Sequence, residues 1–265
     1  MNVNLNLLRY NKISPLQSFK GEIAEPKNKK DFSDDVFFIN MNNYGTNKVW
    51  AAKMKRLALD VSKTISQDVV FENVLEQVQD GIYDINGFVY GIRRTVPEFF
   101  CIKNTDQRGG EYYERYMEKI KNSPQNEFIA KANEDNKSAK VSRIYLVPNQ
   151  DDIIKIDYGF NPIYVNSNIK LASDAYDELK NAKSPRIEDI NKCCATIYWL
   201  IAQGAPYCKG NDSIASILTK AIYHSYGVNI SPLKKGISCD FEAFSTDLDE
   251  YMKNYPNFFQ ETPHL

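Results

Sequence analysis

The sequence has few of the residues that build metal centres and disulfide-bonded folds. Only two of its 265 residues are histidine, and its five cysteines include no CxxC pair. A Cys/His zinc site needs several such ligands at characteristic spacings, and a secreted disulfide framework usually has an even number of cysteines. We therefore expect reduced thiols, no bound metal, and a core that forms without covalent cross-links.

Long apolar runs and an excess of one charge are also missing. The 33 basic and 34 acidic side chains leave a net charge of −1, which excludes a broad electrostatic footprint for nucleic acid. No apolar run approaches the roughly 20 residues of a membrane span, so we expect no integral membrane contact. With 43% apolar and 25% charged residues, the composition is that of an ordinary soluble globular protein.

The chain divides into a polar leader and one domain. Residues 1–35 are rich in Asn and Lys and show no sustained periodicity, which predicts a mobile leader. Apolar periodicity begins just after it, so residues 36–265 are expected to form a single domain. The sequence does not indicate an oligomeric state.

Helices are expected where apolar residues recur every three or four positions. This pattern predicts helices over residues 46–65, 69–79, 111–121, 185–204, 211–227 and from 240 onward. Ser184 is expected to cap the fourth of these helices, with Pro185 at its first position. Helices are expected to dominate the chain after residue 158.

Two β-hairpins are expected between the helices. Asn86-Gly87 accepts the positive φ values of a tight turn, so residues 82–90 are predicted to form the first hairpin. Residues 141–147 and 153–158 are predicted to form the second. The expected fold class is therefore α+β, mostly α, with one or two small β-hairpins.

The loop at residues 204–213, which joins two predicted helices, carries the clearest chemical signal. A short Gly- and Asn-containing loop that opens into a helix directs unpaired backbone N–H groups and the positive end of the helix dipole at one place, and such a place binds anions. Lys209 adds a positive charge beside it. The same residues also suit a plain helix–loop–helix connection.

Residues 205–211, with the sequence APYCKGN, resemble a degenerate Fic motif, His-Pro-Phe-x-(Asp/Glu)-Gly-Asn. Pro206, Tyr207 and Gly210-Asn211 match the motif, whereas Ala205 replaces its histidine and Lys209 its acid. In Fic proteins the histidine activates a target hydroxyl, and the acid holds a metal on the nucleotide phosphates. The resemblance therefore implies a nucleotide site without ordinary Fic adenylylation.

A closer resemblance is to the avirulence protein B (AvrB) family, the third member of the Fic/Doc/AvrB (Fido) superfamily. It rests on the order of features between Ile187 and Phe259: an apolar helix, the Lys209-Gly210 loop, a second helix, and the segment 240–243, Asp-Phe-Glu-Ala. The resemblance places Lys209 at the family's nucleotide-contacting arginine and Asp240 at an acidic pocket residue. It implies a Fido-like helical domain whose donor site lies at the loop.

The residues expected in the site are two catalytic candidates and six donor contacts. They are Asp240 and Arg143 for catalysis, and Lys209, Gly210, Asn211, Asp212, Ser213 and Tyr145 for binding of the donor phosphates. Arg143 and Tyr145 share one face of a predicted strand, where an arginine can reach a phosphate or stay solvated. Asp240 is equally suited to be a helix N-cap.

The resemblance implies a bacterial effector that is delivered by type III secretion into a host cell, with the leader as its secretion signal. It would bind a nucleotide-containing donor and transfer a sugar or nucleotide moiety to a host protein, with a nucleotide sugar, ADP or ATP, or NAD as co-substrate. One alternative is ADP-ribosyl transfer from NAD with Arg143. Another is a non-catalytic Fido fold that only binds host proteins.

Overall fold

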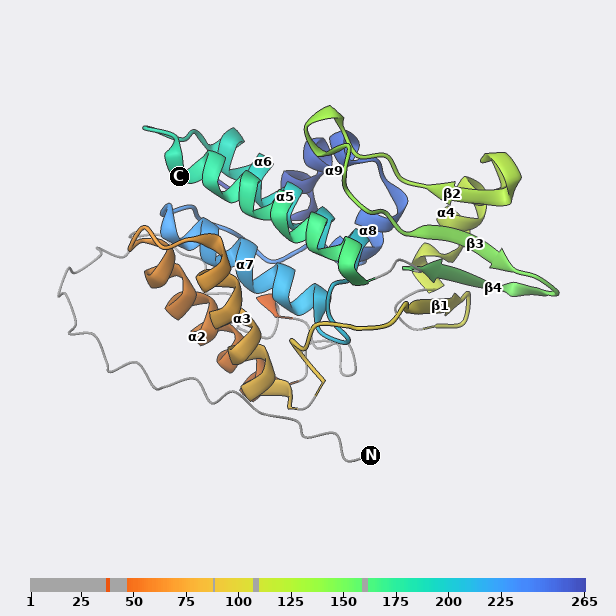
Figure 1. The fold of residues 1–265 in the computed structure, drawn as a ribbon, viewed down its shortest axis with the longest axis horizontal. Helices are drawn as coiled ribbons and strands as arrows, with labels where there is room; N and C mark the ends of the chain where they lie inside the picture. The colour runs from red at the N-terminus through yellow and green to blue at the C-terminus, as the bar shows by residue number, and fades with distance from the viewer. Residues whose placement is uncertain (1–36, 39–46, 88, 107–109, 159–161) are drawn as a thin grey trace. The chain divides into compact units, whose positions relative to one another are not determined.

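The computed structural model describes residues 37–38, 47–87, 89–106, 110–158 and 162–265 (Figure 1). Internal contacts divide the chain into residues 1–31 and residues 32–265, and every described residue belongs to the second unit. The predicted leader, residues 1–35, lies outside the described residues.

The predicted mostly helical α+β fold is confirmed for the part of the chain that the structure describes. Its helices are α2 (Lys48–Ile65), α3 (Phe71–Asn86), α4 (Gly110–Lys121), α5 (Pro162–Asn181), α6 (Ile187–Gly204), α7 (Asn211–Ser225), α8 (Cys239–Ser245) and α9 (Leu248–Asn254). Its strands are β1 (Phe99–Lys103), β2 (Glu127–Ile129), β3 (Arg143–Val147) and β4 (Gln150–Asp157). Short 3-10 turns lie at Pro124–Asn126, Glu134–Asn136 and Tyr255–Phe258.

The four strands form one antiparallel sheet in the order β1-β4-β3-β2. The hairpin of β3 and β4 confirms the second predicted hairpin. One face of the sheet, with the buried residues Ile144, Ile154 and Ile156, packs against α4. β1 and β2 were not predicted from the sequence, because β1 (FFCIK) has no clean alternation and β2 has only three residues.

The first predicted hairpin, residues 82–90, is wrong, and so is the predicted end of the preceding helix at Gln79. α3 continues to Asn86, because its apolar face extends as far as the fully buried Ile82. Gly87 adopts φ 83° and its N–H donates to the Tyr83 carbonyl, which ends the helix. The Asn-Gly pair therefore closes a helix here, and the Asn86 side chain accepts a hydrogen bond from the Trp50 indole N–H at 2.8 Å.

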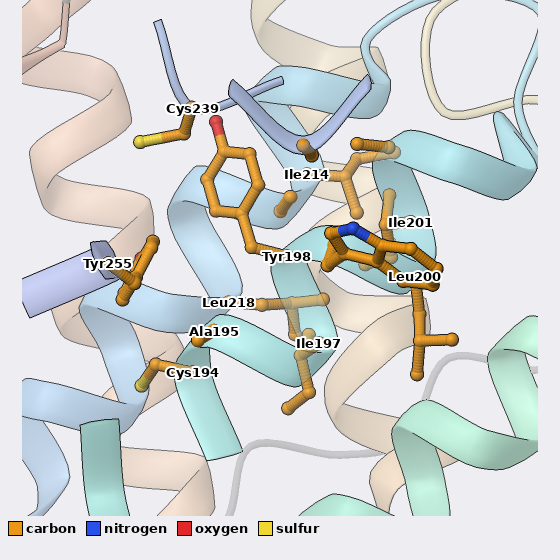
Figure 2. Close-up of a cluster of buried hydrophobic side chains, with 14 of the residues drawn as sticks. Cys194, Ala195, Ile197, Tyr198, Leu200, Ile201, Ile214, Leu218, Cys239 and Tyr255 are labelled. Carbon is orange, nitrogen blue, oxygen red and sulfur yellow. The ribbon is translucent and has the colours of Figure 1, made fainter. Parts of the chain in front are cut away.

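α6 lies at the centre of the helical packing and contacts α5, α7, α8 and α9. Nearly all of its residues from Ile190 to Gly204 are buried. Figure 2 shows its side chains interleaved with those of α7, with Cys239 and Tyr255 close by. Because α7 is also surrounded, an ionisable group that is buried on these two helices needs a partner inside the protein.

Two other predicted helix boundaries differ in the structure. The N-cap of α6 is Arg186, whose backbone N–H donates to Asp189, and not Ser184. The last predicted helix is broken into α8, α9 and a 3-10 turn. It breaks at Thr246, which is extended and whose carbonyl accepts from the Trp199 indole N–H at 2.9 Å.

Candidate functional site

The loop after α6 is fixed by a buried arginine. Ala205 ends the helix in the left-handed conformation, with φ 38° and ψ 60°. Arg94 is only 3% exposed and donates from Nε to the Ala205 carbonyl at 2.6 Å and from Nη2 to the Gly204 carbonyl at 3.1 Å. A cation at these carbonyls also complements the negative end of the α6 dipole. Burial lowers the pKa of Arg94. The backbone carbonyls that accept its hydrogen bonds stabilise the guanidinium charge.

The rest of the loop is held by the segment before β1 and by Asn211. The Cys208 N–H donates to the Ile92 carbonyl at 2.9 Å, and the Arg94 N–H donates to the Pro206 carbonyl at 3.0 Å. The Asn211 side chain accepts from the Tyr207 N–H and donates to the Tyr207 carbonyl. The Asn211 side chain therefore holds the loop, and only the backbone of Asn211 is left for the donor binding predicted for it.

Lys209 and the start of α7 lie at the end of this loop. Gly210 is the N-cap of α7 with φ 86°, a conformation that favours glycine, and a Cβ there would lie 3.2 Å from the Tyr90 ring. Lys209 is exposed, and its ammonium lies 6.0 Å from the centre of the same ring. The structure thus brings an exposed cation next to the N–H groups that begin a buried helix.

Asp212 lies in the first turn of α7, where a negative charge is favoured by the helix dipole. Its carboxylate accepts a hydrogen bond from the Tyr198 hydroxyl of α6. Burial raises the pKa of Tyr198, and the negative charges of Asp212 and Asp240 raise it further. The Tyr198 hydroxyl therefore stays protonated and holds the Asp212 side chain.

Asp240 is not the N-cap of its helix, contrary to one of the roles expected for it. The N-cap of α8 is Ser238, whose hydroxyl donates to the Asp240 carboxylate at 2.8 Å. Asp240 is half-buried in the first turn. This position leaves it partly accessible while a serine fixes its side chain.

Lys220 joins this cluster from two turns further along α7. It lies eight residues after Asp212 and four after Ser216, so the three side chains share one helix face. The Lys220 ammonium donates to the Ser216 hydroxyl and lies 4.9 Å from the centre of the Phe38 ring. Lys220 is 9% exposed, and its burial lowers its pKa. The negative charge of Asp212 partly opposes this shift.

α8 is attached to α4 through a buried acid, Glu242. Arg115 donates from Nη1 and Nη2 to the two Glu242 oxygens at 2.7 and 2.8 Å. The Tyr112 hydroxyl donates to the same carboxylate at 3.0 Å and accepts from the Ser238 N–H at 2.8 Å. Glu242 is therefore occupied by a structural ion pair, and this pair positions the helix that carries Asp240.

Arg143 and Tyr145 lie on the sheet face that does not pack on α4. Arg143 pairs with Asp157 at 3.2 Å and with Glu127 at 3.6 Å, and the Tyr145 hydroxyl donates to Asp157 at 3.1 Å. Their described partners thus lie in the sheet, whereas those of Asp212 and Asp240 lie in α6 and α8. A surface hollow of about 400 Å³ is lined by residues between Arg115 and Phe128 and includes none of the predicted site residues.

The described residues contain no group of three or more His, Cys, Asp or Glu side chains placed to hold a metal. Within the same residues, no helix combines the length and the apolar character that a bilayer crossing requires. Arg94 and Lys220 were not predicted. Arg94 left no signal in the sequence, whereas the spacing of Asp212, Ser216 and Lys220 by four residues places them on one helix face.

Residues 162–262, from α5 to the last 3-10 turn, match the sequence profile of AvrB_AvrC, a family of avirulence proteins. The match includes the loop, Lys209, Asp212, Lys220 and Asp240. It confirms the resemblance to AvrB for this part of the chain. No curated protein matches the chain.

Proposed function

Residues 162–262 are AvrB_AvrC-like, and from this premise we propose that the chain is a bacterial effector that acts inside a host cell. There it binds a nucleotide-containing donor and transfers a sugar or nucleotide moiety to a host protein. Type III secretion is the proposed route of delivery.

One observation carries the donor site: an exposed lysine lies beside the N-terminus of a buried helix. Lys209 and the N–H groups of residues 210–213 offer positive charge at one place, which suits a diphosphate. Asp212 already places a negative charge in this turn and is held by Tyr198. The donor phosphates are therefore expected on the solvent side of the turn, next to Lys209.

Asp240 is the proposed base. In sugar transfer, the acceptor hydroxyl of the host protein forms a new bond to the sugar carbon, and the bond from that carbon to the diphosphate oxygen breaks. Asp240 accepts the hydroxyl proton, and the nucleoside diphosphate leaves with its electron pair. Lys209 and the helix N-terminus stabilise the charge that grows on this leaving group.

Thermal unfolding with a panel of nucleotide sugars, ADP, ATP and NAD tests donor binding. A ligand present at about 100 times its Kd adds about 2.7 kcal/mol of stability, which corresponds to a rise in Tm of roughly 5 °C or more. We expect one donor class to give this rise, Lys209→Ala to abolish it, and the matched surface variant Lys234→Ala to retain it. If Lys209→Ala retains the full rise, the donor site lies elsewhere.

Intact-mass measurement of candidate host proteins, incubated with the protein and each donor, tests transfer. A mass increase equal to the transferred moiety, lost in Asp240→Asn, supports the proposal. No mass shift, together with unchanged host-protein binding by Lys209→Ala and Asp240→Asn, would support a non-catalytic binding module. A mass shift with NAD alone that depends on Arg143 would support ADP-ribosyl transfer.

A further inference from the structure

β1 forms one edge of the sheet, so half of its backbone groups point away from β4 (Figure 1). The Tyr158 N–H donates to the Glu98 carbonyl at 2.9 Å, which places residue 98 in a hydrogen-bonded pair. Because such pairs alternate along an antiparallel ladder, Phe100 and Ile102 bond to β4, whereas Phe99, Cys101 and Lys103 point their N–H and C=O groups outward.

Only the middle of this edge is open. The outward N–H of Lys103 donates to the Asp106 carboxylate at 2.7 Å, and its carbonyl accepts from the Asp106 N–H at 3.1 Å. At the other end, Pro97 has no N–H. The backbone groups of Phe99 and Cys101 form no hydrogen bond to another described residue on this side. Phe99 and Cys101 therefore present two N–H donors and two C=O acceptors, spaced as in a β-strand, to a further strand.

The side chains at this edge are apolar and exposed. Phe99 is 61% exposed and Phe100 is 45% exposed, and they lie on opposite faces of the sheet. Natural edge strands are usually protected by charges, prolines or covering segments. Phe99–Cys101 contains no charged residue and no proline, and no strand among the described residues pairs with its outer side. The edge therefore has the features of a surface that pairs with another strand.

The charges beside the edge indicate what that strand contains. Lys103 is exposed and shares a face with Phe99, and the Lys155 ammonium lies 4.2 Å from the centre of the Phe99 ring. Lys155 already pairs with Asp157 at 3.6 Å, so an acidic side chain on an added strand would face Lys103. Its apolar neighbours would cover Phe99 and Phe100. Main-chain pairing supplies affinity in such contacts, and alternate side chains supply specificity.

We propose that the edge of β1 binds an extended segment of another protein, which adds as a fifth strand and carries apolar residues and one acidic residue. This docking does not require a bound donor or group transfer. It gives the protein a way to hold a partner through a short linear segment.

The test uses a phage-displayed library of random 12-residue peptides, selected on the whole chain. The blocking variant is Cys101→Pro, which removes an outward N–H and places a ring in the path of the added strand. Proline is tolerated at an edge position whose N–H is not used by the neighbouring strand. The matched control is Cys101→Val, which keeps the N–H and favours a strand.

We expect the selected peptides to bind the natural chain and Cys101→Val with affinities within about twofold, and to bind Cys101→Pro at least tenfold more weakly. Should Cys101→Pro fail to fold, N-methylation of the peptide provides the same test, because methyl groups on alternate residues block only one edge of the strand. One methylation register should then abolish binding and the other should leave it intact.

Three outcomes overturn the proposal. The first is that no peptide is enriched. The second is that enriched peptides bind Cys101→Pro as well as they bind Cys101→Val, or tolerate methylation in either register. The third is a dimer in sedimentation that dissociates in Cys101→Pro, because the edge would then be occupied by a second copy of this chain.

Discussion

At the scale of single residues, one face of α7 carries polar and charged side chains, whereas most of the buried side chains of this helix are apolar. Asp212, Ser216 and Lys220 follow each other at intervals of four residues, and Tyr198 and Cys239 face them from other helices. A buried ammonium loses its hydration, and one hydroxyl with an aromatic ring only partly replaces it. Lys220 is therefore expected to lower the free energy of unfolding. Such a cost is common for residues that are retained for function.

Lys220→Met should raise the free energy of unfolding by about 1–2 kcal/mol, because it keeps the side-chain length and removes the buried charge. Urea unfolding at pH 7 measures this change. The exposed Lys253→Met is the control and should change stability by less than about 0.5 kcal/mol. A loss of stability in Lys220→Met would mean that the ammonium makes a net favourable contribution.

At the scale of elements, α4 and α8 are joined by a buried carboxylate. Glu242 is 5% exposed and accepts a bidentate pair from Arg115, whose side chain is 44% exposed. Tyr112 adds a third hydrogen bond. Because α8 begins only a few residues before Glu242, this network positions Asp240 from a helix that is distant in the sequence.

Arg115→Ala should destabilise the protein by about 2–3 kcal/mol, because it leaves the Glu242 charge buried with fewer partners. In a double-mutant cycle with Glu242→Gln, the coupling energy should exceed about 1 kcal/mol. Urea unfolding of the two single variants and the double variant provides both numbers. Additive effects would show that the ion pair does not hold α8.

The helices α2, α4, α6 and α7, the hairpin of β3 and β4, and the Lys209 loop were predictable because periodicity and turn residues are local signals, whereas the range of α5 was not predicted. Residues 82–90 were mispredicted because Asn86-Gly87 suits both a tight turn and a helix end, and only the burial of Ile82 in the folded core decides between them. The attachment of Arg94 to the end of α6 depends on contacts more than 100 positions apart. No local pattern records such contacts.

At the scale of the whole molecule, the protein buries three thiols and many tyrosines. Burial raises the pKa of Cys193, Cys194 and Cys239 above the ordinary value of 9.0, and burial raises that of Tyr198, Tyr251 and Tyr255 above 10.0. In the unfolded chain these groups lose their protons near their ordinary pKa values. The folded protein therefore binds more protons than the unfolded chain in alkaline solution.

Stability should therefore fall as the pH rises above about 9. Each thiol that keeps its proton only in the folded state contributes a slope of about 1.4 kcal/mol per pH unit, so three thiols approach about 4 kcal/mol per unit near pH 10. The lowered pKa of Lys220 partly opposes this fall in stability, because the unfolded chain keeps that lysine protonated to higher pH. Urea midpoints between pH 7 and 10 measure this dependence of stability on pH. Cys193→Ala should reduce its slope by the contribution of one thiol, about 1.4 kcal/mol per pH unit. A flat profile would mean that the thiols ionise in the folded protein.

The donor site is tested at its own atoms by the backbone amide resonances of residues 210–213, followed by NMR while ADP or a nucleotide sugar is added. We predict saturable shifts at Gly210 and Ser213 that disappear in Lys209→Ala and persist in Lys234→Ala. Unchanged resonances in this turn at millimolar ligand, or shifts confined to residues outside α6, α7 and α8, would contradict donor binding at the start of α7.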